Sequence, residues 1–222
     1  MKHFNSASEQ YDAYERILLR ENEKYNLTAI TDPADIRRKH FADSLALLDH
    51  FEVAQGARLL DVGSGAGFPG VPLKIERPDL EVSLLDSTAK KCNFLYMLGT
   101  ELELPLKIYC ERAEEAAYDP AMRERFDIVV SRAVAGLPTL LELCLPFVAV
   151  GGVFVAYKGM RGQTDEEMER VLRALPLLGG EIESVVDEQT EYGHRTLVIV
   201  RKNRQCQPEY PRNYAAISKK PL

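Results

Sequence analysis

The sequence predicts an α/β fold built on a mostly parallel β-sheet, and three observations lead to this class. From about residue 58, short apolar runs alternate with amphipathic segments of helical periodicity. The runs are almost continuously apolar, which is typical of parallel strands covered by helices on both faces. A short connection joins the last two runs, so they form a hairpin and introduce an antiparallel strand. Together the patterns predict a seven-stranded sheet whose last strand is antiparallel.

Two helices are expected before the sheet, over residues 7–24 and 33–51. The first places Tyr11, Tyr14 and Leu18 on one face. Asp32 can cap the second helix, and Pro33 suits its first turn. The apolar stripe of the second helix consists of Ile36, Phe41, Leu45 and Leu48.

The expected sheet and its covering helices extend from residue 58 to residue 201. The strands cover 58–62, 82–86, 106–110, 126–131, 152–157, 181–189 and 194–201. The helices cover 70–77, 88–101, 112–117, 137–148 and 165–175. Because no repeat or linker divides the chain, we expect one domain over 1–222. Its parts are a helical extension (1–55), a Rossmann-like core (56–202) and a basic tail (203–222).

The composition is that of an ordinary globular chain. Of 222 residues, 45% are hydrophobic and 28% are charged, which excludes a disordered chain, a collagen-like fibre and a disulfide scaffold. A chain of this length can bury roughly 70% of its unfolded surface, so its core needs no metal or disulfide. The longest uncharged run lies between Glu142 and Lys158 and is interrupted by proline and glycine, whereas a membrane span needs ~18 apolar residues in a row, so we expect no membrane partner. The four cysteines form no CxxC pair, which suits a reducing cytoplasm and predicts no metal site.

The charge is unevenly distributed along the chain. The net charge of −6 argues on its face against a polyanionic partner. Residues 201–222, however, carry six basic residues and one acid, giving +5, so the remainder carries −11. A basic tail on an acidic body is compatible with nucleic-acid contact or with a merely solvated terminus.

The sharpest signal for function is the segment from Asp61 to Gly70, which reads Asp-Val-Gly-Ser-Gly-Ala-Gly-Phe-Pro-Gly. An apolar strand ends in a carboxylate and continues into a glycine turn that opens a helix. Residues without side chains let a ligand approach the backbone, and the helix start offers unpaired N–H groups. The pattern indicates a nucleotide-like ligand.

Two ligands fit this turn. Gly65, Gly67 and Gly70 match the dinucleotide pattern GxGxxG, which by itself is weak. Asp61 could instead meet a cationic amino-acid group, and Pro69 occupies the helix start that a pyrophosphate would use. These two features favour S-adenosylmethionine over NAD.

Further candidates follow the next strands, because ligands in open α/β sheets bind beyond the carboxyl ends of strands. Asp86 could hold ribose hydroxyls, or cap the helix after Thr88, or do both. Ala113 and Glu114 follow the third strand, where a crossover loop could run along the edge of an adenine ring. Arg132 and Lys158 fall over the expected pocket, where each is either a positioning residue or part of a salt bridge at the sheet edge.

His40 and Asp43 lie one helical turn apart in the second helix. They could form an acid–base pair. A hydrogen bond that orients the helical extension is the favoured reading, and we do not assign them a catalytic role.

Several motifs occur in an order that resembles a known family. They are Asn26-Leu27-Thr28, His40-x-x-Asp43-Ser44, the segment 61–70, Leu85-Asp86-Ser87, Ser131-Arg132-Ala133 and Lys158-Gly159. Over residues 20–202 the chain resembles the bacterial small-subunit ribosomal RNA guanine-N7 methyltransferases, also called glucose-inhibited division protein B. The tail shares Tyr210-Pro211-Arg212 and the basic end, but residues 213–218 depart from the glycine-containing pattern of that family.

The resemblance implies an S-adenosylmethionine-dependent methyltransferase with a Rossmann-like fold. The reaction it implies is methyl transfer to N7 of one guanine in 16S ribosomal RNA, in the cytoplasm, on naked RNA or the 30S subunit. We expect a monomer. The family's cofactor residues map to Gly63, Phe68, Ala113, Glu114 and Arg132, beside Gly65, Gly67, Asp61 and Asp86 from the reasoning above. Its RNA-binding positions map to Arg112, Arg132, Lys158 and Arg195.

Three other functions remain open at this point. The first is methylation of a small molecule by the same fold. The second is RNA or ribosome binding without catalysis. The third and least favoured is NAD-dependent oxidoreduction.

Overall fold

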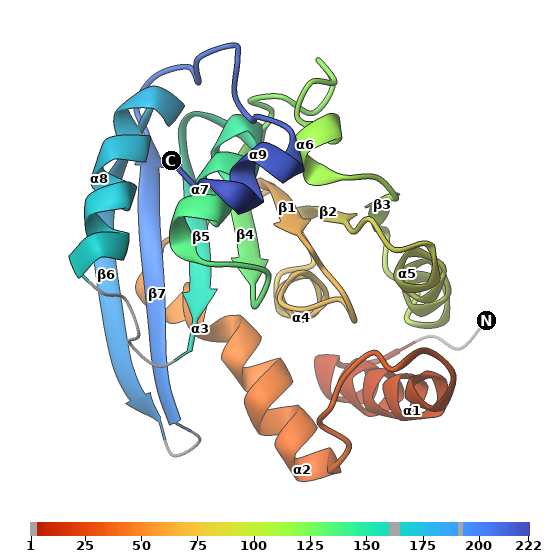
Figure 1. Ribbon diagram of the computed structural model, residues 1–222. Helices are drawn as coiled ribbons and strands as arrows, with labels where there is room; N and C mark the ends of the chain where they lie inside the picture. Colours follow the sequence, from red (N-terminus) through yellow and green to blue (C-terminus); the bar gives the residue numbers. More distant parts are fainter. Residues whose placement is uncertain (1–3, 160–164, 191–192) are drawn as a thin grey trace.

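The computed structural model describes residues 4–159, 165–190 and 193–222, and its centre is one seven-stranded sheet (Figure 1). The strand order is β3-β2-β1-β4-β5-β7-β6. The strands are β1 (Arg58–Val62), β2 (Glu81–Leu85), β3 (Lys107–Tyr109), β4 (Phe126–Arg132), β5 (Val148–Lys158), β6 (Gly180–Thr190) and β7 (Gly193–Lys202). All seven predicted strands are present. β5 begins four residues earlier than expected, at Val148 rather than at residue 152.

Strands β1 to β5 are parallel, and β7 is antiparallel to both of its neighbours, β5 and β6. The predicted antiparallel last strand and the β6–β7 hairpin are therefore confirmed. The antiparallel strand does not end the sheet, however. β7 fills the position between β5 and β6, so the edge strand β6 again runs in the direction of β1 to β5.

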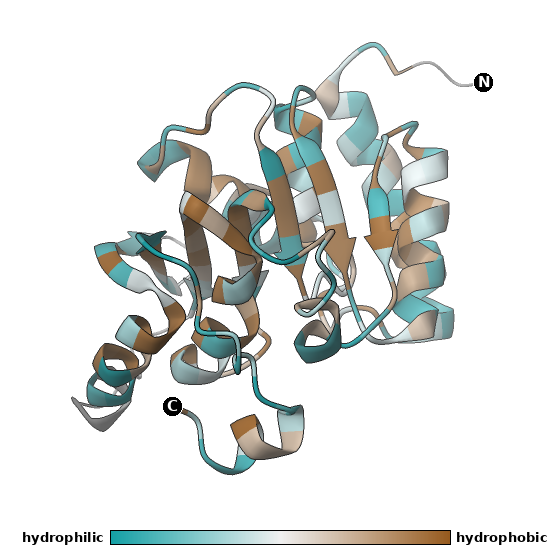
Figure 2. Cartoon of the chain, turned by 90° about the horizontal axis from the view of Figure 1, so that it is seen from above, coloured by the Kyte–Doolittle hydropathy of each residue, from teal (hydrophilic) through white to brown (hydrophobic). Residues whose placement is uncertain are grey.

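Helices cover both faces of the sheet (Figure 1). One buried cluster joins the sheet to α1 (Ala7–Tyr25), α3 (Asp43–His50), α4 (Gly70–Glu76) and α5 (Ala89–Glu101). The opposite cluster joins it to α6 (Ala113–Ala116), α7 (Leu137–Cys144), α8 (Asp165–Leu178) and α9 (Tyr214–Lys219). Hydrophobic residues concentrate in the strands between these layers (Figure 2). This double covering explains the nearly continuous apolar strands.

The helical extension agrees with the sequence prediction up to Ile36 and then departs from it. Asp32 caps α2 (Pro33–Ile36) by accepting from the N–H of Asp35 at 2.9 Å. A π-helical turn, η1 (Arg37–Ala42), then leads into α3. This wider turn rotates the following face, so Leu47 is fully buried while Leu45 and Leu48, expected in the apolar stripe, are half-buried.

Residues 203–222 pack back onto the body of the protein. Arg212 forms a bidentate ion pair with Glu142 of α7, at 2.8 and 2.7 Å, and Glu142 has no exposed surface. The side chain of Asn213 caps α9, and Ile217 is fully buried against the second cluster. The basic tail is therefore a structural part of the α7 side of the sheet.

Two further observations concern the described residues only. Their four cysteines are free, three of them buried and Cys110 exposed. None of the helices in the described ranges is long and apolar enough to span a bilayer.

Candidate functional site

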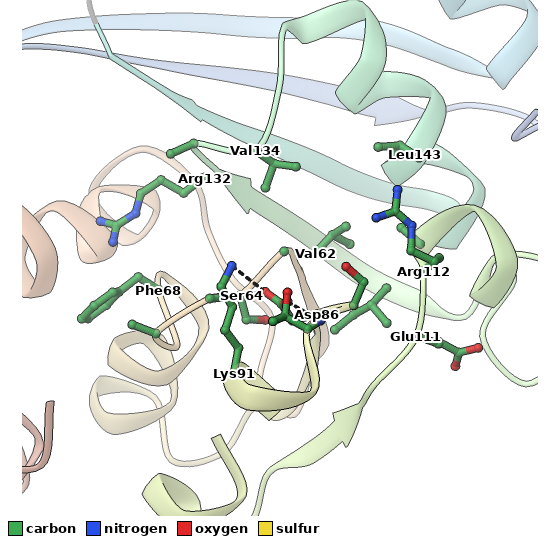
Figure 3. Close-up of a pocket in the computed structure, with 18 of the residues that line it drawn as sticks. Val62, Ser64, Phe68, Asp86, Lys91, Glu111, Arg112, Arg132, Val134 and Leu143 are labelled. Carbon is green, nitrogen blue, oxygen red and sulfur yellow. Dashed lines mark hydrogen bonds and ion pairs between the residues drawn. The ribbon is translucent and has the colours of Figure 1, made fainter. Parts of the chain in front are cut away.

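A cavity of about 450 Å³ opens beyond the carboxyl ends of β1, β2 and β4 (Figure 3). This is the place where open α/β sheets bind their ligands, and the volume is ordinary for a small-molecule site. The predicted residues that line it are Gly63, Gly65, Phe68, Asp86, Arg112, Ala113, Glu114 and Arg132. Residues far apart in the sequence thus meet in one cavity.

The glycine turn is held by the end of β2. The N–H groups of Gly63 and Ser64 both donate to the carbonyl of Leu85, at 2.8 and 3.1 Å. Gly65, which lines the cavity, has a φ of +57°, in the left-handed region, and a Cβ there would meet only the carbonyl oxygen of Gly63, at 3.9 Å. The turn therefore forms a cradle that any side chain at Gly65 would partly fill.

Asp86 fastens the glycine turn to the start of α5, and its place in the cavity leaves the predicted contact with ribose hydroxyls open to it. Its Oδ1 accepts from the N–H of Thr88 at 2.9 Å, at the start of α5, and its Oδ2 accepts from the N–H of Gly65 at 3.0 Å. Lys91 approaches the same carboxylate at 3.6 Å (Figure 3). Because each carboxylate oxygen has two lone pairs, Asp86 can also accept from hydroxyl groups in the cavity that it lines.

Asp61 lies elsewhere than expected. Its side chain is fully buried beneath the turn and does not line the cavity, so the predicted direct contact with a cationic ligand group is not seen. Oδ2 accepts from the N–H of Gly70 at 2.9 Å, which holds the start of α4. Oδ1 has no hydrogen-bond partner among the described residues. Burial raises the pKa of Asp61 to about 7.

Gly67 also stands behind the cavity. Its φ is +95°, and a Cβ there would come within 2.6 Å of the Tyr14 hydroxyl. That hydroxyl donates to the carbonyl of Ala66 at 2.5 Å. The glycine is therefore needed for the close approach of α1 to the turn.

A cluster around Arg132 forms one wall of the cavity. The guanidinium donates to Asp43 Oδ2 at 2.7 Å and lies 5.0 Å from the centre of the Phe68 ring. His40 stacks on Phe68, with ring centres 4.5 Å apart. Arg195 pairs with the other oxygen of Asp43. Arg195 thus reaches Arg132 through a shared carboxylate, although it does not itself line the cavity.

The hydrogen bonds of His40 fix its tautomer. Arg132 can only donate, and it approaches His40 Nδ1 at 3.3 Å, so Nδ1 must be the unprotonated nitrogen. Nε2 then carries the proton and donates to Thr28 Oγ1 at 2.8 Å. Burial, with a further contribution from the charge of Arg132, lowers the pKa of His40 to about 4. His40 is therefore neutral at pH 7, and its hydrogen bonds join Thr28 of the helical extension to Arg132 at the end of β4.

The opposite wall carries an aromatic residue that sequence reasoning missed. Tyr214, the first residue of α9, lines the cavity, and the guanidinium of Arg112 lies 4.5 Å from its ring centre. Arg112 also donates to Glu114 at 2.9 Å. Figure 3 shows Arg112 and Arg132 on either side of Asp86. No local pattern marks Tyr214, because it follows no strand and reaches the cavity only through the folding of the tail.

Lys158 lies outside the cavity, and two residues that were not proposed lie in it. Lys158 donates to the carbonyl of Ala135 at 3.0 Å, in the loop after β4, and does not line the cavity. Thr28 and Lys91, which were not proposed, do line it. Thr28 could have been found from its place in the ordered motif set. In the described parts of the chain, no three His, Cys, Asp or Glu residues gather as metal ligands.

The site fits S-adenosylmethionine. The open cradle at Gly65 suits a ligand that approaches the backbone, and Asp86 offers acceptors for hydroxyl groups. When Asp61 is ionised, its Oδ1, which has no hydrogen-bond partner among the described residues, places negative charge beneath the turn, and this charge favours a cationic ligand.

Solved structures with the same fold include S-adenosylmethionine-dependent methyltransferases. One from Aquifex aeolicus aligns with a TM-score of 0.55 at 18% identity, covering 76% of this chain and 93% of that one. Geranyl diphosphate C-methyltransferase from Streptomyces coelicolor aligns with a TM-score of 0.58 at 16% identity, covering 72% and 78%. At these identities the likeness shows the Rossmann-like fold. Together with a family profile that matches residues 7–197, the fold and the site make the protein a methyltransferase by class, with S-adenosylmethionine as the methyl donor.

Within that class, the chain belongs to the rRNA small subunit methyltransferase G family, whose profile matches residues 7–197. The curated member from Desulfitobacterium hafniense is 46% identical, covering 96% of this chain and 89% of its own length. The member from Acetivibrio thermocellus is 44% identical, covering 98% and 91%. The resemblance inferred from the motifs is therefore confirmed.

Proposed function

We propose that the protein transfers a methyl group from S-adenosylmethionine to N7 of a specific guanine in 16S ribosomal RNA. The observation that carries the proposal is the cavity at the end of β1, which joins the glycine cradle and Asp86 to the Arg132 cluster in a member of this family. Residues 1–222 act as one methyltransferase domain with a helical extension (1–55), a core (56–202) and a basic tail (203–222). We propose that it works as a monomer, in the cytoplasm where ribosomal RNA is found.

The donor would be held by one set of residues and the RNA by another. For the donor these are Gly63, Gly65, Phe68, Asp86, Ala113, Glu114 and Arg132, with Asp61 and Gly67 supporting the turn from behind. For the RNA they are Arg112, Arg132, Lys158 and Arg195. Of these four, Arg112 and Arg132 line the cavity, while Arg195 shares Asp43 with Arg132.

The reaction requires the protein to position the two reactants, and it requires no general base. When bound, S-adenosylmethionine supplies an electrophilic methyl group on a sulfonium centre. Guanine N7 carries an in-plane lone pair and needs no deprotonation before it attacks. The neutral His40 agrees with this, because its Nδ1 accepts from Arg132 and is not available as a general base. Holding the two reactants in line can contribute roughly 7–11 kcal/mol.

The decisive experiment is a transfer assay with methyl-labelled donor. Purified protein should label 16S ribosomal RNA, supplied as naked RNA or as the 30S subunit, and the label should be N7-methylguanine. A Gly65→Asp variant serves as the control, because its side chain fills the cradle and should abolish donor binding. Absence of label in both the naked RNA and the 30S subunit would refute the proposed function. Comparing the two forms identifies the substrate.

A further inference from the structure

We propose that a basic groove between α8 and the C-terminal segment binds backbone phosphates of the RNA substrate, apart from the donor cavity. The groove has a volume of about 630 Å³. Five basic residues from two distant parts of the sequence line it: Arg170, Arg173, Arg212, Lys219 and Lys220. The inference rests on the proposed function and names a second point of contact with the same substrate.

The structure separates the six basic residues of positions 201–222 into two groups. Four of them are committed to the protein itself. Arg201 pairs with Glu183, the buried Lys202 donates to Leu145, Arg204 donates to Pro176, and Arg212 pairs with the buried Glu142. Lys219 and Lys220 remain, and both are exposed at the groove. The positive charge that the tail offers to a partner is therefore concentrated at this one place.

Arg173 of α8 adds a third exposed cation from across the groove. In the described part of the chain, no carboxylate pairs with Arg173, Lys219 or Lys220. Three cations without counter-charge repel one another, and a phosphate between them relieves that repulsion with charge-assisted hydrogen bonds. On a protein whose net charge is −6, this concentration is a specific feature.

The groove adjoins the donor cavity through α9. Tyr214 at the start of that helix lines the cavity, and Lys219 at its end lines the groove. A six-residue helix is only about 9 Å long, so the two sites are close together. An RNA strand that places a base in the cavity would have neighbouring phosphates within reach of the groove. This continuity favours RNA as the ligand.

The test compares RNA binding at several salt concentrations. A Lys219→Ala/Lys220→Ala variant should bind a 16S RNA fragment about tenfold more weakly at low salt. The slope of log K against log salt should become shallower by about 1.4–1.8, from two lost phosphate contacts. Arg173→Ala should lower the slope by about half as much. Calorimetry should show unchanged affinity for S-adenosylmethionine in both variants.

The matched control is Arg16→Ala/Lys107→Ala, which removes two basic residues of α1 and β3, outside the groove. If the groove variants bind RNA with the slope of this control, while wild-type protein still labels RNA, the groove proposal is wrong and the proposed function stands. If wild-type protein labels no RNA, the function itself fails and the groove proposal falls with it. Competition by an acidic peptide as strong as that by RNA of equal charge would assign the groove to a protein partner instead.

Discussion

Asp61 shows how a single buried carboxyl can make stability depend on pH. Burial raises its pKa from 3.8 to about 7, so the folded chain holds a proton that the unfolded chain releases. The stabilisation from this group is complete below about pH 3.8 and is lost as the pH rises through 7. A charged ligand in the cavity can shift the protonation equilibrium of Asp61, because this carboxyl lies directly beneath the glycine turn.

We therefore expect the stability of Asp61→Asn, measured relative to wild type, to be higher at pH 8 than at pH 5. The amide cannot ionise, and its oxygen can still accept from Gly70. Urea unfolding at both pH values measures the difference. Asp127→Asn is the control, because Arg58 keeps the pKa of Asp127 below 3.8 and its effect should be equal at both. An equal effect of Asp61→Asn at pH 5 and pH 8 would contradict the assignment.

Arg132 combines a site role with a structural one. Its side chain is only 12% exposed and pairs with Asp43, which is 5% exposed. Arg132→Ala should lower turnover on 30S subunits roughly a hundredfold, since one wall of the cavity loses its charge. It should also cost about 1–3 kcal/mol of unfolding free energy, because Asp43 loses one of the two ion pairs that it forms with described residues. Kinetics and urea unfolding separate the two effects.

Arg195→Ala provides the comparison, since it removes the other partner of Asp43 without opening the cavity. It should destabilise to a similar extent and leave donor affinity unchanged. Equal turnover and equal donor affinity in Arg132→Ala and wild-type protein would exclude the site role of Arg132.

Among the elements, α9 reaches the cavity through Tyr214, which forms part of its wall. We expect Tyr214→Ala to weaken S-adenosylmethionine binding by roughly 2–10-fold, the range of one aromatic contact. Tyr214→Phe keeps the ring beside Arg112 and should bind almost as wild type does. Calorimetric titration with the donor measures both. If Tyr214→Ala binds normally, the ring is not part of the donor site.

The tail as an element is held by the ion pair between Arg212 and Glu142. Arg212→Ala would leave the buried carboxylate of Glu142 with the backbone N–H of residue 212 but without its charged partner, which costs about 3–5 kcal/mol. The double variant Arg212→Met/Glu142→Leu removes both charges and should recover much of that loss. Thermal and urea unfolding provide the measurement. A small loss in the single variant would show that solvent reaches Glu142.

At the level of elements, local patterns predicted most of the fold. Strands such as β1 are unbroken apolar runs that end at turn residues, so their limits can be read along the chain. The π turn over Arg37–Ala42 and the insertion of β7 between β5 and β6 depend on contacts between distant segments. The same dependence on distant contacts explains the site. Adjacent residues do not show that Tyr214 lines the cavity or that Asp61 is buried beneath it.

For the molecule as a whole, the net charge of −6 bounds how strongly bare electrostatics can bind RNA. With about four phosphate contacts, made by Arg132 and the groove residues Arg173, Lys219 and Lys220, affinity should fall roughly 50–150-fold between 50 and 200 mM salt, against 10³–10⁵ for strongly basic binders. Fluorescence anisotropy with a labelled 16S fragment measures this. A much steeper fall would mean that more of the surface takes part than the Arg132 wall and the groove.

The contact between Tyr14 and the carbonyl of Ala66 has a consequence for dynamics. It fastens α1 to the very turn that cradles the donor. If the packing of α1 against the turn strengthens donor binding, then by thermodynamic linkage donor binding must strengthen the packing of α1 by the same free energy. Amide hydrogen exchange in residues 7–25 should therefore slow when S-adenosylmethionine is added, although none of those residues lines the cavity.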